Sequence, residues 1–211
     1  MAGNTVVDAL LYMRETMRNG YRPTDKVLAA LPSTSKLVLA TLHGREKVGE
    51  PLRNLLRALR TLGADGDKLI VLPVHPDPPV RAEVIGILRY APNVWLLDPP
   101  QYADFVYLLS RAWVVVGASG EVQEQARTFG LPILITGETA ERPDVVEAGF
   151  GTLGGCDYQA IVDGVRKLTA GDRPHLLPAR NPFGHGDSSE HIAARLSSGL
   201  FEGQQSLLAA E

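Results

Sequence analysis

Short, almost uninterrupted apolar runs alternate with longer amphipathic segments along most of the chain. The apolar runs, typical of strands buried on both faces, lie at residues 36–43, 68–75, 94–98, 112–117, 132–136 and 151–155. Apolar side chains recur at helical spacing at residues 5–18, 49–63, 79–90, 101–110, 120–129, just after 143, 157–169 and near 188–199. A loop or short connector is expected at residues 20–35. This alternation predicts βαβ units and one parallel sheet.

Right-handed crossovers favour an α/β fold with a doubly wound, Rossmann-like sheet of six strands. With the strand order 3-2-1-4-5-6, the order reverses between the first and fourth strands. Ligands bind beyond the carboxyl ends of the strands at such a switch point, so we expect the site between the loops that follow these two strands. We also expect an N-terminal helix and connector at residues 1–35, the Rossmann-like domain at 36–200 and a tail at 201–211.

Composition and charge exclude several classes of protein. Hydrophobic residues make up 45% of the chain and charged residues 21%, as in ordinary globular proteins. The net charge of −3 lacks the basic footprint of a nucleic-acid-binding domain. No apolar run is long enough to span a bilayer, and the first residues do not resemble a signal peptide. We therefore expect a cytoplasmic protein with neither nucleic acid nor membrane as a partner. The single cysteine, Cys156, excludes an intrachain disulfide and a Cys-rich zinc site.

The two loops at the expected switch point carry groups that suit an anion. The loop at residues 43–47 places Arg45 beside the site, and the fourth strand leads through Gly117 to Ser119 and Gly120 at a helix start. Serine is a good N-cap, and the free N–H groups and the dipole of a helix start attract anions. Together the loops suit a phosphate or a pyrophosphate.

Simpler interpretations stay open for several of these residues. A serine before a glycine is often only a helix cap, and histidines at strand ends, such as His43 and His75, are more often structural. The run at residues 141–143 fits a turn with a surface ion pair. The fingerprints of dinucleotide-binding folds and P-loops are absent. No carboxylate spacing supports a metal site at His185 and His191, so we expect neither a metal nor another cofactor.

Six segments resemble, in the same order, the motifs of one family. The matching segments are NTVVDAL (4–10) to GNTVIDAL, HGREKVGE (43–50) to HRREN-x-GE, PVHPDPPVR (73–81) to PVH-x-NP-x-VR, ASGEVQEQA (118–126) to DSGGIQEEA, TAERPDVVEAG (139–149) to T-x-RPE-x-x-EAG, and NPFGHGDSSEHI (181–192) to NPYGDG-x-A-x-x-RI. Nearly the whole chain is covered. The chain therefore resembles the C-terminal, UDP-binding half of the non-hydrolysing UDP-N-acetylglucosamine 2-epimerases.

The resemblance implies the C-terminal domain of a GT-B fold, in which two Rossmann-like domains flank a cleft. It also implies an isomerase that interconverts UDP-GlcNAc and UDP-ManNAc for polysaccharide biosynthesis. UDP is eliminated to leave a 2-acetamidoglucal and is then added back with C2 inverted. The family's N-terminal domain, which supplies the acidic groups implicated in moving the C2 proton, lies outside the matching segments. Proton abstraction needs a base within hydrogen-bond reach, so we expect this half to need that domain for turnover.

By resemblance, the groups that hold UDP surround the helix start after the fourth strand. Ser119 and Gly120 would hold the phosphates, and Glu124 and Gln125 would reach the ribose. Glu121 stands where the family has a second glycine, beside the phosphates, and should repel an anion. Gln125 replaces a glutamate, which would make a ribose contact neutral.

The remaining candidates lie in the other matching motifs. By resemblance, His43 and Arg45 lie near uracil and the reacting sugar, and His43 is the candidate catalytic residue. His75 and Arg142 are further possible site residues. Gly44 departs from the family, which has an arginine there.

Three functions stay open. The first is the UDP-binding half of a UDP-GlcNAc 2-epimerase, and the second is a catalytically inactive module that binds a UDP-sugar or a partner protein. The third is the C-terminal half of a GT-B glycosyltransferase. The helices at 5–18 and near 188–199 should leave apolar surface exposed, and such patches mark interfaces. We therefore expect a homo-oligomer or a separate N-terminal-domain partner.

Overall fold

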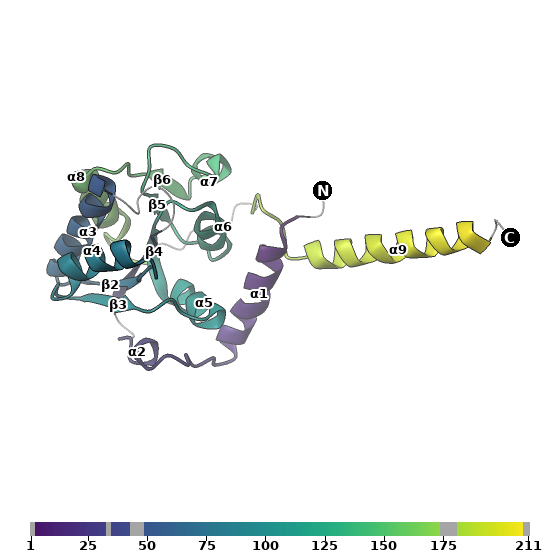
Figure 1. Ribbon diagram of the computed structural model, residues 1–211, viewed down its shortest axis with the longest axis horizontal. Helices are drawn as coiled ribbons and strands as arrows, with labels where there is room; N and C mark the ends of the chain where they lie inside the picture. Colours follow the sequence, from purple (N-terminus) through teal and green to yellow (C-terminus); the bar gives the residue numbers. More distant parts are fainter. Residues whose placement is uncertain (1–2, 33–34, 43–48, 174–180, 209–211) are drawn as a thin grey trace.

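A six-stranded parallel sheet forms the centre of the computed structural model, which describes residues 3–32, 35–42, 49–173 and 181–208 (Figure 1). The strands are β1 (Lys36–Ala40), β2 (Lys68–Pro73), β3 (Val94–Leu97), β4 (Ala112–Val116), β5 (Ile133–Ile135) and β6 (Gly151–Leu153). Their order, β3-β2-β1-β4-β5-β6, is the predicted one. The order reverses between β1 and β4, so the predicted switch point is confirmed.

Helices cover both faces of this sheet. The described helices are α1 (Thr5–Arg18), α2 (Lys26–Ala29), α3 (Gly49–Ala64), α4 (Pro78–Leu88), α5 (Tyr102–Arg111), α6 (Gly120–Thr128), α7 (Pro143–Glu147), α8 (Tyr158–Leu168) and α9 (Ser188–Leu208), of which α1 to α8 pack on the sheet. Apolar side chains of α3, α4 and α8 form one buried cluster with the sheet. Those of α1, α2, α5, α6 and α7 form the other. The structure therefore has the three layers of a doubly wound α/β fold.

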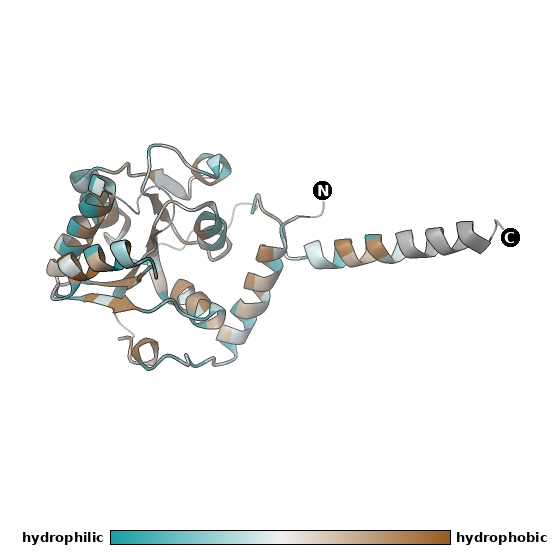
Figure 2. Ribbon diagram, viewed as in Figure 1, coloured by the Kyte–Doolittle hydropathy of each residue, from teal (hydrophilic) through white to brown (hydrophobic). Residues whose placement is uncertain are grey.

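The strands are apolar at successive positions because both faces of the sheet are buried. Along β1, Val38 and Ala40 belong to the cluster with α3, while Leu37 and Leu39 belong to the cluster with α5. Successive side chains of a strand point to opposite faces, so a sheet between two helical layers needs apolar residues at both. Figure 2 shows these hydrophobic strands between the helices.

The structure departs from the predicted elements mainly at their ends. The first strand ends at Ala40, so Thr41 and Leu42 follow it as loop residues. The expected connector contains the one-turn helix α2, because the Asp25 side chain accepts hydrogen bonds from the backbone N–H groups of Val27 and Leu28. The last helix continues to residue 208 and projects away from the sheet (Figure 1).

Asp104 fixes the connector between α1 and β1 onto helix α5. Asp104 is 2% exposed, and its carboxylate accepts hydrogen bonds from the Tyr21 hydroxyl, the Thr24 hydroxyl and the backbone N–H groups of Thr24 and Asp25. Burial by itself raises the pKa of Asp104, but the bonds from Thr24 and Tyr21 outweigh it, and the pKa lies below its ordinary value. Asp104 therefore helps to position α5. In the part of the chain that the structure describes, no helix is long and apolar enough to cross a membrane.

Candidate functional site

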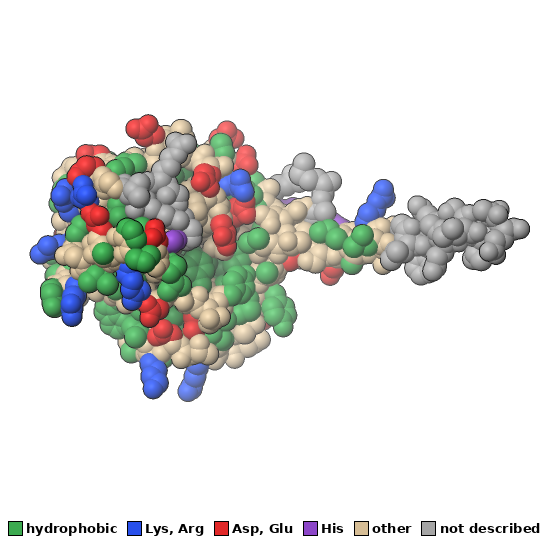
Figure 3. Space-filling model, in the orientation of Figure 1, with side chains coloured by type: hydrophobic (Ala, Val, Ile, Leu, Met, Phe, Trp, Pro, Cys, Tyr) green, Lys and Arg blue, Asp and Glu red, His purple; other side chains and the backbone are tan. Residues whose placement is uncertain are grey.

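A cavity of about 480 Å³ lies at the predicted switch point, beyond the carboxyl ends of β1, β2, β3 and β4. Its lining residues are Thr41, Leu42, Pro73, Val74, His75, Pro76, Pro99, Pro100, Tyr102, Phe105, Ser119, Glu121, Val122 and Gln125. Most of the wall is apolar, and a few polar groups come from the start of α6. Figure 3 shows hydrophobic side chains gathered in a hollow, with acidic side chains over α6 at its border. Such a combination is typical of a small-molecule site.

The start of helix α6 forms the polar wall of the cavity. Ser119 is the N-cap, and its Oγ accepts a hydrogen bond of 3.3 Å from the backbone N–H of Val122. The predicted cap is thus present. Gly117, at the end of β4, is required by packing, because a Cβ there would lie 2.3 Å from the Thr41 hydroxyl. This glycine is therefore explained by the close approach of β1 to β4.

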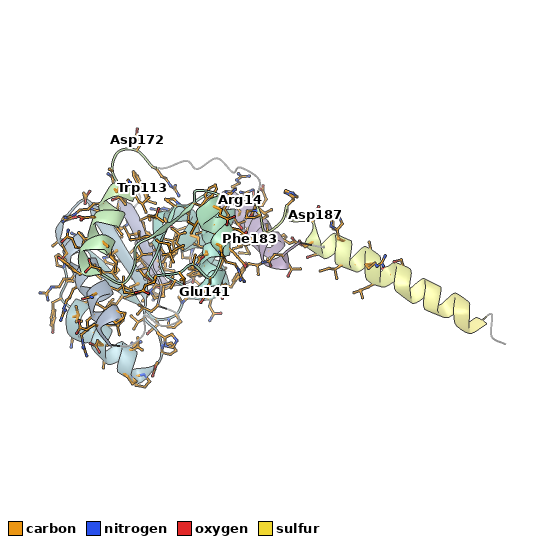
Figure 4. The ribbon with its side chains drawn as sticks, turned by 90° about the horizontal axis from the view of Figure 1, so that it is seen from above. Arg14, Trp113, Glu141, Asp172, Phe183 and Asp187 are labelled. Atoms are coloured by element: carbon orange, nitrogen blue, oxygen red, sulfur yellow. The ribbon has the colours of Figure 1, made fainter. Side chains whose placement is uncertain are left out.

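An acidic side chain of this chain already occupies one donor at the helix start. The backbone N–H of Gly120 donates to Oε2 of Glu141 over 2.5 Å. Glu141, labelled in Figure 4, belongs to the loop between β5 and α7. A carboxylate is stabilised at a helix N-terminus by the dipole. The donor that the resemblance assigns to a phosphate is therefore engaged by an internal carboxylate.

Glu124 makes an interhelical link and is not among the residues that line the cavity. Its side chain is 8% exposed, and its two oxygens accept hydrogen bonds of 2.6 Å each, one from Nε of Arg142 and one from Nδ2 of Asn4. Asn4 is also the N-cap of α1. Instead of a surface ion pair within the 141–143 turn, Arg142 pairs with a nearly buried carboxylate of α6. This link joins the starts of α1 and α7 to helix α6.

Glu121 and Gln125 lie one turn apart on α6 and both line the cavity. Nε2 of Gln125 donates to Oε1 of Glu121 over 3.0 Å, and Gln125 is 4% exposed. Tyr102 lines the facing wall on α5. Burial raises the pKa of the Tyr102 hydroxyl, and the negative charge of Glu121 raises it further. Glu121 and Tyr102 are exposed, so these side chains add hydrogen-bonding groups to an open part of a largely apolar cavity wall.

The structure brings only some of the other predicted residues to this cavity. His75 lines it and accepts a hydrogen bond at Nδ1 from the backbone N–H of Asp77. His43 and Arg45 lie outside the described residues.

Residues that lie outside the six matching family segments also line the cavity. Thr41 lines the cavity and is 5% exposed, yet its hydroxyl has no hydrogen-bond partner within the described ranges. Phe105 and Tyr102 contribute aromatic rings from α5. Thr41 was detectable as the first polar residue after the strand, whereas the α5 side chains carry no signal beyond helical spacing.

A sequence profile of UDP-N-acetylglucosamine 2-epimerase matches residues 1–197. The chain is 36% identical over 202 residues to the UDP-N-acetylglucosamine 2-epimerase of Escherichia coli K12, covering 93% of this chain and 54% of that protein. It is also 36% identical over 201 residues to the enzyme of that name from Campylobacter jejuni, covering 91% of this chain and 52% of the relative. The chain therefore spans about half the length of the curated relatives it matches.

Solved structures agree with this comparison. The UDP-GlcNAc 2-epimerase of Neisseria meningitidis bound to UDP-GlcNAc superposes with a TM-score of 0.81 at 30% identity, covering 94% of this chain and 55% of that one. The S. aureus MnaA–UDP complex gives 0.81 at 29% identity, covering 95% and 53%. The E. coli heptosyltransferase WaaC, at 17% identity and a TM-score of 0.51, shares the fold alone. The chain belongs to the UDP-N-acetylglucosamine 2-epimerase family and corresponds to its C-terminal half.

Proposed function

We propose that this chain binds UDP, or the UDP part of a UDP-sugar, in the cavity at the switch point, as the nucleotide-binding half of a UDP-GlcNAc 2-epimerase. The observation that carries the proposal is the cavity itself, which combines an apolar wall with the capped start of α6 at the carboxyl edge of the sheet. Family membership supports it, as do the related structures solved with UDP-GlcNAc and with UDP.

The two walls suit the two ends of a nucleotide. Phe105, Pro99 and Pro100 offer an apolar surface to a flat base. The N–H groups and the dipole at Ser119 and Gly120 favour a diphosphate. In this arrangement the diphosphate replaces the Glu141 carboxylate on the N–H of Gly120.

The same end of α6 suits the departure of UDP in an elimination. As the bond from C1 of the sugar to the diphosphate breaks, negative charge grows on the leaving oxygen, and oriented N–H groups stabilise such charge. Removal of the C2 proton needs a base within reach. Among the described residues that line the cavity, the titratable side chains are His75, Tyr102 and Glu121. We propose that turnover also needs acidic groups from a domain equivalent to the other half of the relatives.

Helices α1 and α9 provide a surface for such a partner. Tyr12 on α1 is 75% exposed, and Leu196 on α9 is 63% exposed. Asp8 on α1 accepts hydrogen bonds from the backbone N–H groups of Ser188 and Ser189 and so holds the start of α9, near Asp187 in Figure 4. We propose that this face contacts the other half of the family's fold, with a second copy of the chain as the alternative. Light scattering at micromolar concentration tests the alternative, which a strictly monomeric protein excludes.

Calorimetric titration of the chain with UDP tests the proposed function. We expect binding, and we expect Ser119→Ala to weaken it by roughly tenfold, because the start of α6 loses its cap next to the diphosphate. Ser198→Ala, on an exposed part of α9, should bind like the parent protein. A folded parent chain that gives no heat with UDP would refute the proposal.

One observation favours the second candidate, a module that binds a UDP-sugar without turnover. Glu121 and Glu141 place two carboxylates near the start of α6, where an active enzyme must accommodate a diphosphate. Incubation with UDP-GlcNAc, alone and with the N-terminal half of a relative, distinguishes the two. UDP-ManNAc formed only with the added half supports the enzyme, whereas binding without product in either case supports the module.

A further inference from the structure

The first matching family segment, NTVVDAL (4–10), holds none of the candidate site residues, yet its first residue contacts helix α6. Asn4 caps α1, because its Oδ1 accepts a hydrogen bond of 2.9 Å from the backbone N–H of Val6. The amide nitrogen, Nδ2, donates over 2.6 Å to Oε2 of Glu124. A cap needs only the oxygen, which serine or aspartate would supply equally well. The amide nitrogen of Asn4 therefore serves the contact with Glu124.

Glu124 connects Asn4 to the turn between β5 and α7. Its Oε1 accepts a hydrogen bond of 2.6 Å from Nε of Arg142. The backbone N–H of Arg142 donates over 3.2 Å to Oε1 of Gln123, the preceding residue of α6. Gln123 is fully buried and Glu124 is 6% exposed. Two neighbouring, buried residues of α6 thus fix both the backbone and the side chain of Arg142.

The guanidinium of Arg142 lies over the start of helix α6. A Cβ atom added to Gly120 would lie 3.4 Å from Cζ of Arg142 and 3.0 Å from Oε2 of Glu141. The dipole makes this end of a helix positive, so it favours anions and disfavours a cation. The ion pair with Glu124 offsets that cost and keeps the cation next to the donor that binds Glu141. An anion bound at Gly120 therefore meets a guanidinium that is already in place.

We propose that Asn4 is a positioning residue of the nucleotide site, which acts through Glu124 to hold the guanidinium of Arg142 beside the anion at the start of α6. The inference rests on the proposed function, because it places a diphosphate at the N–H of Gly120. When the diphosphate replaces Glu141 there, a guanidinium that is already fixed loses little rotamer freedom on binding. Asn4 itself does not line the cavity, so its effect on the ligand depends on Arg142.

A double-mutant cycle separates this role from that of a helix cap. Asn4→Ser keeps an oxygen that caps α1, whereas its shorter side chain has no amide to reach Glu124. We expect it to weaken UDP binding roughly three- to tenfold, the range for one hydrogen bond, but by less than about twofold in an Arg142→Ala background. Uridine, which has no diphosphate, should bind Asn4→Ser and the parent protein alike. Calorimetry on the full chain measures the Kd values.

Asp157→Ser is the matched control, since it exchanges one capping residue for another at α8, which packs on the opposite face of the sheet from α6. It should bind UDP like the parent protein, and circular dichroism should show that every variant is folded. If the parent protein binds UDP but Asn4→Ser has no effect, or the same effect with and without Arg142, the inference is overturned while the proposed function stands. If the parent protein does not bind UDP, both are overturned.

Discussion

The two ends of the sheet differ in how many partners their charged and polar side chains have. At the amino end, Lys68 is 5% exposed and pairs with Asp65 and Asp67, while Arg166 makes two hydrogen bonds of 2.8 and 3.0 Å to Asp65. At the carboxyl end, Glu121 has only an amide as its partner among the described residues, and the hydroxyl of Thr41 has none.

Buried polar groups in proteins are normally satisfied, and an exception calls for an explanation. In the cluster of Asp65, Asp67, Lys68 and Arg166 at the amino end, each charged side chain has an oppositely charged neighbour. At the carboxyl end Glu121 is exposed, whereas the buried hydroxyl of Thr41 lines a cavity and has no partner among the described residues. The difference fits a first cluster that stabilises the fold and agrees with the ligand site that we propose at the carboxyl end.

The largest expected effect is on stability, from Asp65→Asn at the amino end. Loss of this carboxylate leaves Lys68 with Asp67 alone and Arg166 without its bidentate partner. Breaking a buried ion pair is strongly destabilising, and because Asp67 remains, we expect a loss of about 2 kcal/mol at pH 7. Urea unfolding followed by circular dichroism measures it. Glu15→Gln, in an exposed pair with Arg18, should change stability by less than about 0.5 kcal/mol.

The loss of stability caused by Asp65→Asn should depend on pH in the acid range. The hydrogen bond from Arg166 and the charge of Lys68 lower the pKa of Asp65 from 3.8 to about 2. A depressed pKa contributes stability that is present above the unfolded value of 3.8 and is lost as the pH falls toward 2. The difference in unfolding free energy between the parent and Asp65→Asn should therefore shrink from about 2 kcal/mol at pH 5 to near zero at pH 2. A difference that stays constant over this range would contradict the role given to Asp65.

Thr41→Val separates stability from binding at the carboxyl end. A buried hydroxyl without a partner is destabilising, so replacing it with a methyl group should leave the unfolding free energy unchanged or raise it by up to about 1 kcal/mol. If a ligand uses this hydroxyl, UDP should bind roughly three- to tenfold more weakly. Thermal unfolding and calorimetry on the same samples measure both quantities.

Thr128→Val is the matched control for Thr41→Val. Thr128 is 9% exposed, and its hydroxyl donates to the backbone oxygen of Glu124 and so has a partner. This variant should lose stability and keep its affinity for UDP. The contrast between the two ends would fail if Thr41→Val were the more destabilising of the pair.

Much of the fold could be predicted from the sequence because its signals are local. Helix α1 was predicted with its observed ends, because apolar side chains recur at helical spacing within residues 5–18. The strand order is the one that doubly wound sheets of six strands commonly have. The start of the candidate site at Ser119 was equally local, because an N-cap depends on residues within one turn.

The contacts that orient Glu124 and occupy the N–H of Gly120 join residues far apart in the sequence. Glu124 bonds to Asn4 across 120 positions, and Glu141 reaches Gly120 across 21. The spacing of apolar residues along the chain carries no information about such long-range contacts. They determine that Glu124 turns toward α1 and α7 and that the start of α6 holds a carboxylate, neither of which motif spacing indicates.

The smallest expected effect concerns that carboxylate. Glu141→Gln removes a negative charge that competes with a diphosphate for the N–H of Gly120, but the glutamine oxygen still accepts a hydrogen bond. UDP affinity should therefore rise only about two- to fivefold, and less at high salt, because charge–charge repulsion near the surface is screened. Glu138→Gln, in the same loop, controls for a general change in charge. An unchanged or weaker affinity for UDP would mean that the diphosphate does not use this donor, and that a bound ligand lies nearer to the unpartnered hydroxyl of Thr41.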